Sequence, residues 1–117
     1  MNLIFSLLFL LLASLPAWAQ TAGDPTAGKA KYDMYCATCH GAGGMGDGAA
    51  SVALTPKPRN FQDPVVMGKK TDADLKKVIK EGGAAVGLST TMPAWGTAMT
   101  DVDIDNVIAY IRTLGKK

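Results

Sequence analysis

The chain has 117 residues, of which 48% are hydrophobic, and its formal net charge is +2 at neutral pH. This length suffices for one small domain with a modest core. The weak positive charge gives no electrostatic basis for binding nucleic acid, so the sequence predicts no nucleic-acid partner.

Residues 1–19 predict a secretory signal peptide. The apolar run LIFSLLFLLLASL is followed by Pro16 and by the small-x-small end AWA, the pattern that precedes cleavage. The run is too short to span a membrane comfortably. An uncleaved anchor is the alternative, because no Lys or Arg precedes the run. Cleavage after Ala19 would leave residues 20–117 as one domain in the bacterial periplasm, without stable membrane insertion.

Two helices are predicted in the first two thirds of this domain. The first runs from about Asp24 to Cys39, with Asp24 as its N-cap and Pro25 at the first helical position. The second begins at Thr71, where TDAD resembles a capping box with Asp in place of Glu. It is predicted to end at the glycine pair that starts at Gly82.

A third helix is predicted from Thr100 to Gly115. It begins with another Thr-x-x-Asp sequence, and five apolar residues share one face: Ile104, Val107, Ile108, Ile111 and Leu114. Residues 41–70 are rich in Gly and Pro and show no alternating strand pattern. The chain is therefore predicted to be all-α, with long loops of the kind that surround a functional site or are disordered.

The sequence YCATCH contains both cysteines, Cys36 and Cys39, and the only histidine, His40. A thioredoxin-like dithiol would need a helix N-terminus, whereas these cysteines end the predicted first helix. A closed zinc site needs four ligands, and adjacent Cys39 and His40 would converge on one metal with difficulty. A disulfide across such a short loop would add little stability.

A covalent c-type haem is the fourth interpretation of this motif. Two cysteines at this spacing can form thioethers with one porphyrin, and His40 then serves as the proximal iron ligand. This interpretation explains the spacing, the adjacent histidine and the export signal together. The chain is therefore predicted to bind one haem c through Cys36, Cys39 and His40.

The exported domain resembles the small class I monohaem cytochromes c. The family's Gly-x₃-aromatic-x₃-C-x-x-C-H pattern is matched by Gly28, Tyr32 and Cys36, and its last-helix motif by VIAY at residues 107–110. GMGDG, after the haem motif, is also similar. The resemblance implies the cytochrome c fold, with three or more helices and long loops around one covalent haem. It further implies that the first and last helices cross at Gly28, where glycine permits close approach.

Met92 is predicted to be the second axial ligand, which gives the haem iron His/Met ligation. The chain has no second His, and Pro93 favours an extended backbone at Met92. A Met-Pro before the last helix is also where the resemblance places this ligand. The other methionines of the exported domain have poorer positions or plausible packing roles: Met34, Met45, Met67 and Met99.

Three further residues have candidate roles around the haem. The family's proline carbonyl that orients the proximal imidazole is replaced here by Ala49, whose own carbonyl could do the same. Trp95 could donate to a haem propionate, or pack as a buried aromatic. Arg59 could pair with a propionate, or remain a solvated surface charge.

The resemblance implies an electron carrier rather than an enzyme, because two protein ligands leave the iron no open position for a substrate. Partners would be donor and acceptor redox proteins that dock transiently. A group of lysines is either a docking patch for an acidic partner or a solvated helix face: Lys69, Lys70, Lys76, Lys77 and Lys80. The alternatives are a tightly bound haem subunit of a larger oxidoreductase complex, or a haem enzyme or ligand sensor if Met92 is not a stable ligand.

Overall fold

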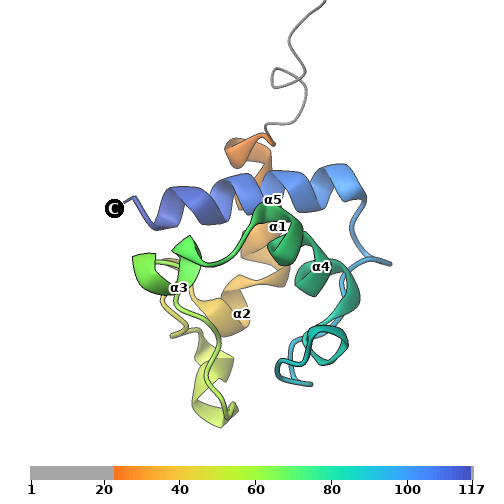
Figure 1. Ribbon diagram of the computed structural model, residues 1–117. Helices are drawn as coiled ribbons and strands as arrows, with labels where there is room; N and C mark the ends of the chain where they lie inside the picture. The colour runs from red at the N-terminus through yellow and green to blue at the C-terminus, as the bar shows by residue number, and fades with distance from the viewer. Residues whose placement is uncertain (1–22, 117) are drawn as a thin grey trace, which may run out of the picture.

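The structure, a computed structural model, describes residues 23–116. Within this range it contains only helices, in the order α1 (Pro25–Tyr35), α2 (Ala37–His40), η2 (Ala49–Ala53), α3 (Pro64–Gly68), α4 (Asp72–Glu81), η3 (Ala84–Val86) and α5 (Asp101–Leu114) (Figure 1). The all-α prediction is confirmed. None of these helices is long and apolar enough to cross a membrane. The predicted signal peptide, residues 1–19, lies outside the described residues.

The first predicted helix is present but is divided in two. Asp24 is its N-cap and accepts a hydrogen bond from the Thr26 amide, with Pro25 in the first turn as predicted. The helix breaks at Cys36, where φ is −114°. Four-residue α2 follows at once, and its amide–carbonyl bonds restart from the Cys36 carbonyl, which accepts from the amide of His40 at 2.9 Å. The expectation of one unbroken helix to Cys39 was therefore wrong.

The predicted starts of α4 and α5 are confirmed. Thr71 forms a full capping box with Asp74, and Thr100 forms one with Asp103. In each box the threonine hydroxyl and the aspartate carboxylate accept hydrogen bonds from each other's backbone amides, so two free amides are satisfied at each helix start. α4 ends at Gly82 as predicted, with φ of +87°.

One helix that was not predicted is α3, within the expected long loop. Its N-cap, Asp63, accepts hydrogen bonds from the amides of Val65 and Val66, and Pro64 follows in the first turn. The same Asp-Pro pair begins α1, so the sequence did carry a signal for this helix start. The segment was interpreted as loop because it is short and rich in Gly and Pro.

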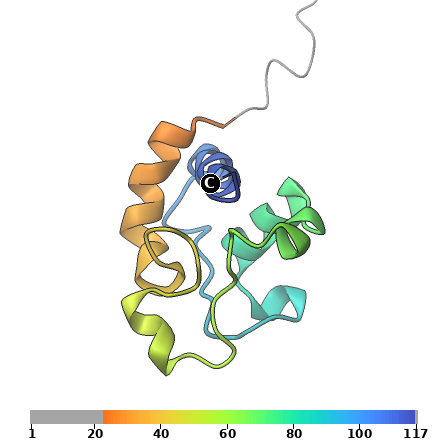
Figure 2. The same cartoon turned by 90° about the vertical axis from the view of Figure 1, so that its left-hand side faces the viewer.

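The α1–α5 pair organises the core. A Cβ added to Gly28 would overlap the backbone carbonyl of Asn106, so the two helices approach at the predicted glycine. The largest fully buried side chains of the described residues are Tyr32, Ile104, Val107 and Leu114. Figure 2 views α5 nearly end-on, with α1 on one side and the α3–α4 region on the other. The space between these two sides is where the candidate site lies.

Candidate haem-binding site

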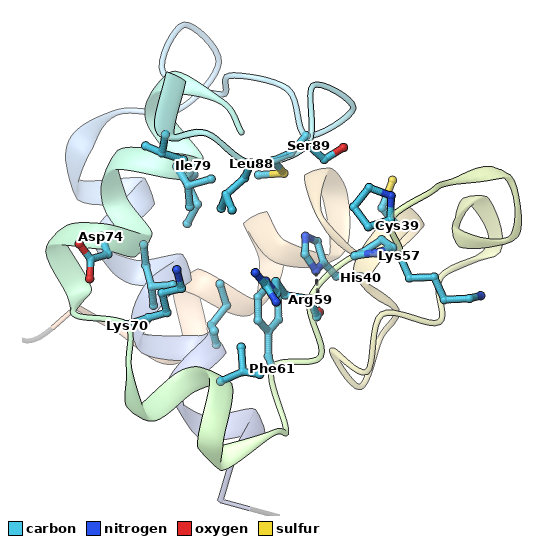
Figure 3. A pocket seen from close by; sticks show the side chains of 18 of the residues that line it. Cys39, His40, Lys57, Arg59, Phe61, Lys70, Asp74, Ile79, Leu88 and Ser89 are labelled. Atoms are coloured by element: carbon cyan, nitrogen blue, oxygen red, sulfur yellow. Dashed lines mark hydrogen bonds between the residues drawn. The ribbon is translucent and has the colours of Figure 1, made fainter. Parts of the chain in front are cut away.

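A cavity of about 450 Å³ separates α2 from α4 and the segment that follows it. Its apolar lining includes side chains from five parts of the chain: Leu54, Phe61, Leu75, Ile79, Leu88 and Ile111. In Figure 3, His40 and Phe61 lie on one side, and Ile79 and Leu88 reach in from across the cavity. Loop and helix residues far apart in sequence therefore build one apolar chamber.

Cys36 is the residue that joins α1 to α2, and Cys39 lies within α2. Both are free thiols; Cys39 lines the cavity, while Cys36 is buried in the core beside it. Burial raises the pKa of Cys36 to about 12, with the neighbouring Cys39 adding to the rise. A redox-active dithiol needs a lowered thiol pKa, so the environment of Cys36 argues against the thioredoxin-like interpretation.

The remaining alternatives also find no support in the described residues. Cys36 and Cys39 are not joined as a disulfide. Within residues 23–116, no cluster of three or more His, Cys, Asp or Glu side chains could hold a metal ion by itself. The two thiols and His40 thus do not form even a three-ligand group here, whereas a closed zinc site needs four ligands.

His40 reaches the cavity with one ring nitrogen already occupied. Its Nδ1 lies 3.2 Å from the backbone carbonyl oxygen of Arg59, and its ring stacks on Phe61 at 4.4 Å between centroids. A carbonyl oxygen can only accept, so the contact requires a proton on Nδ1 and leaves the Nε2 lone pair free in the neutral ring. Burial lowers the pKa of His40, partly opposed by this hydrogen bond, and so favours the metal-binding neutral form.

The carbonyl that orients His40 differs from the expected one. Ala49 was the candidate from the sequence, but Ala49 begins the 3₁₀ helix η2, and Arg59 supplies the carbonyl instead. The Phe61 amide donates to the Gly44 carbonyl at 2.6 Å, and this bond brings the segment around Arg59 beside the haem motif. The sequence did not reveal Arg59 as the partner of His40, because this contact depends on the path by which a long loop comes back to the haem motif.

The structure sorts the methionines of the described chain into three groups. Met34 and Met45 are 65% and 53% exposed, and Met99 is buried in the core, 3% exposed, as its predicted packing role requires. Only Met67 and Met92 line the cavity. Met67 was not expected there, and its presence leaves two thioethers as candidate iron ligands.

Met92 lies on the segment between α4 and α5, which folds back against the end of α4. The Met92 carbonyl accepts from the Gly83 amide at 3.0 Å, and the Met92 amide donates to Ser89 at 3.3 Å. Met67 belongs to α3 and is 8% exposed. The two methionines therefore approach the cavity from different elements.

The predicted supporting residues have different outcomes. Arg59 lines the cavity, and Figure 3 shows its side chain directed into it. Trp95 is not among the lining residues; its ring packs against Tyr35 at 5.1 Å between centroids, and its amide donates to the Ile79 carbonyl. Of the two roles considered for Trp95, the structure therefore shows packing.

The predicted lysine group does not form a single free patch. Lys76 pairs with Asp105 at 3.0 Å and Lys80 pairs with Asp101 at 2.9 Å, which links α4 to α5. Lys70 and Lys77 instead line the cavity. Four of the five lysines thus divide between ion pairs across the helices and the lining of the cavity, whereas Lys69 is exposed and belongs to neither set.

Comparisons with known proteins identify the family of this chain. The family model described as "Cytochrome C oxidase, cbb3-type, subunit III" matches residues 23–111. Cytochrome c-554(547) of Halothiobacillus neapolitanus is 32% identical over 93 residues, which cover 80% of this chain and 99% of that protein. The cbb3-type cytochrome c oxidase subunit CcoP of an Azospirillum species is 34% identical over 102 residues, 87% of this chain but 32% of that protein.

A solved structure titled "KustC0563 c-type cytochrome" has the same fold. It superposes with a TM-score of 0.62 at 22% identity, over 74% of this chain and 95% of that one. This chain belongs to the cytochrome c family that the matching model and the Halothiobacillus relative define. It is a small monohaem c-type cytochrome, its cofactor is covalent haem c, and its class transfers electrons.

Proposed function

We propose that this cytochrome carries single electrons between larger redox proteins in the bacterial periplasm. Its haem c is attached to Cys36 and Cys39, and its iron is held by His40 and Met92. Donor and acceptor dock transiently, so that the carrier can exchange partners at each turnover. The predicted signal peptide supports export, and the Halothiobacillus relative, which this chain covers almost completely, supports a free carrier.

The observation that carries the proposal is the shared cavity of His40 and Met92. A free Nε2 faces an apolar chamber, and a thioether from a segment far along the chain lines the same chamber. Cys39 adds a thiol in the wall next to His40, and Cys36 lies one turn earlier on the same bend. This donor set, a neutral imidazole, a thioether and two thiols, fits a covalent haem.

When bound, the haem supplies an iron that alternates between Fe(III) and Fe(II). This couple transfers one electron, and the chain's own residues keep the accompanying rearrangement small. Arg59 and Phe61 fix the orientation of His40, by a hydrogen bond and by ring stacking. The apolar walls keep water away from the metal, and thioether ligation favours the reduced form, so both raise the reduction potential.

A second candidate is a tightly bound electron-transfer subunit of a larger oxidoreductase. The CcoP relative favours it, because a domain like this chain makes up about a third of that oxidase subunit. Purification of the native protein at low detergent and salt distinguishes the two. A free carrier elutes at the mass of the monomer, whereas a subunit elutes with a larger oxidase.

The first prediction concerns Met92. Oxidised holoprotein should show the weak far-red sulfur-to-iron band of Met-ligated haem, and Met92→Ala should remove this band. The same substitution should lower the midpoint potential, because it removes the ligand that prefers Fe(II). Imidazole added to the variant should bind readily at the vacated position. Absorption spectroscopy and a redox titration measure these changes.

Met67→Ala and Met99→Ala are the matched controls. Both should keep the band. Met67→Ala enlarges the cavity and Met99→Ala weakens the core, so each should lower stability without removing the iron ligand. Loss of the band in Met67→Ala with retention in Met92→Ala would assign the ligand to α3 instead. If the wild type lacks the band and binds carbon monoxide at once when reduced, the carrier proposal is replaced by a ligand-binding or catalytic one.

A further inference from the structure

Helix α3 stands apart from the other helices although it forms part of the haem cavity wall. Within the described chain, no other helix packs closely along it. A second cavity of about 170 Å³ lies between α3 and the end of α5, and its lining includes Pro64, Met67, Ile111 and Arg112. Helix-to-helix packing therefore does not fix the distance between α3 and α5.

The side chain of Arg112 bridges the two elements. Its Nε donates to a carboxylate oxygen of Asp72 at 2.9 Å. Its Nη1 donates to the carbonyl of Met67 at 3.1 Å, and its Nη2 to the carbonyl of Lys70 at 2.6 Å. All three guanidinium nitrogens thus bind the corner at which the chain leaves α3 and enters α4.

These three acceptors belong to successive parts of that corner. The Met67 carbonyl is in the last turn of α3, Lys70 is in the connection, and Asp72 is the first residue of α4. The Met67 carbonyl also accepts from the Lys70 amide at 3.2 Å, so the planar fork of Arg112 adds a second bond at the end of α3 and binds the connection at a fixed angle. A lysine could replace the charge but not this geometry.

The corner also forms one wall of the haem cavity. Val66, Met67 and Lys70 line that cavity, and so does Ile111, the residue before Arg112. We infer that Arg112 is a positioning residue for electron transfer, which holds the α3–α4 wall against the haem without touching it. This inference rests on the proposed function only in assuming that the cavity holds the haem.

Two consequences follow from a loosened wall. Water would reach the haem more easily, and the polar solvent would stabilise the more highly charged Fe(III) state and lower the midpoint potential. External ligands would also reach the iron faster. The free energy lost with charge-assisted bonds of this kind is large enough to make local opening of the α3–α4 wall about tenfold more frequent.

The test compares Arg112→Gln with wild-type holoprotein. We expect a lower midpoint potential, entry of imidazole to Fe(III) about tenfold faster, and amide hydrogen exchange in α3 faster by a similar factor. Exchange in α1 and α5 should change little. Arg112→Lys, which keeps the charge but not the fork, should shift the same three measurements in the same direction and is the variant used if Arg112→Gln does not load haem.

Two controls separate positioning from general stability. Asp72→Asn keeps both carbonyl bonds of Arg112 and should leave the potential near wild type, because Asp72 is 72% exposed. Ile104→Val weakens the core away from the cavity and should lower the melting temperature without changing the potential. The inference is overturned if Arg112→Gln and Ile104→Val behave alike, or if α3 exchange is unchanged. Absence of the Met band in wild type would instead contradict only the proposed ligands.

Discussion

His40 is held in place by two neighbours while its other ring nitrogen stays available to bind iron. The backbone carbonyl of Arg59 accepts a hydrogen bond from Nδ1–H, and Phe61 covers one face of the ring. These two contacts orient the imidazole before any metal is bound, which reduces the conformational cost of ligation. Burial lowers the pKa of His40 and favours the neutral ring, although the hydrogen bond to Arg59 partly opposes this effect. The atoms responsible are a backbone carbonyl and an aromatic ring, so neither contact depends on an acidic side chain.

Gly28 illustrates a residue whose absent side chain determines the fold. Gly28→Ala should lower the free energy of unfolding by about 3 kcal/mol, because the new Cβ overlaps the Asn106 carbonyl and must push α5 away. Gly68→Ala is the matched control: it lies in α3 and its Cβ would meet nothing within 4 Å. Denaturant titration of both holoproteins measures the difference. Equal effects would show that close helix approach is not required at Gly28.

The helices α4 and α5 both begin with a Thr-x-x-Asp capping box, and ion pairs join the two helices. Each capping box involves residues only three apart, so each can form before the tertiary structure does. The pKa of Asp74 and that of Asp103 lie below the usual value, chiefly because each carboxylate accepts a hydrogen bond from the backbone of its threonine. Helix starts are therefore sensitive to acid.

This sensitivity predicts the stability of the protein at low pH. A lowered folded pKa gives stability that is present above the unfolded value and is lost as pH falls through the folded value. Stability should therefore decline as pH falls below about 4. The decline should be shallower in Asp74→Asn/Asp103→Asn, which removes both titrating carboxylates but keeps an acceptor oxygen at each position.

The matched control is Glu81→Gln, at the other end of α4. Glu81 is exposed and makes no ion pair or side-chain hydrogen bond within residues 23–116. Urea titrations of the three proteins, from about pH 3 to about pH 7, cover the range in which carboxyl groups titrate. If Asp74→Asn/Asp103→Asn loses stability with falling pH as steeply as wild type does, this account is contradicted.

At the scale of the whole molecule, the cavity interrupts the hydrophobic core. Its lining includes Phe61, Leu75, Ile79 and Ile111, which are themselves core residues, so the core is completed only when the cavity is filled. A small domain has little other apolar surface to bury. The polypeptide should therefore depend on its haem for cooperative folding.

Removal of the attachment sites tests this dependence. Cys36→Ala/Cys39→Ala, produced without haem, should lack a cooperative thermal transition, because the apolar walls then face water or collapse. Circular dichroism and calorimetry against wild-type holoprotein measure the loss. Wild-type polypeptide produced without haem is the control for the two substitutions themselves. A sharp transition near the holoprotein's melting temperature would show that the chain folds without its cofactor.

The sequence by itself determined the features that depend on neighbouring residues. The caps at Asp24, Thr71 and Thr100 and the haem motif were predictable, because their interactions span only a few positions. Gly28 was predictable through the family resemblance. The short helix α3 was within reach of the same logic, since its Asp-Pro start repeats that of α1.

Only the tertiary structure decided which distant residues meet. It made Arg59 rather than Ala49 the partner of His40, and it brought Met67 as well as Met92 to the cavity. It also divided four of the five lysines between ion pairs and the cavity lining. It also revealed the three bonds of Arg112 to the α3–α4 corner. Such contacts depend on the path of loops whose ends are fixed by packing elsewhere, and no local preference of the chain encodes that path.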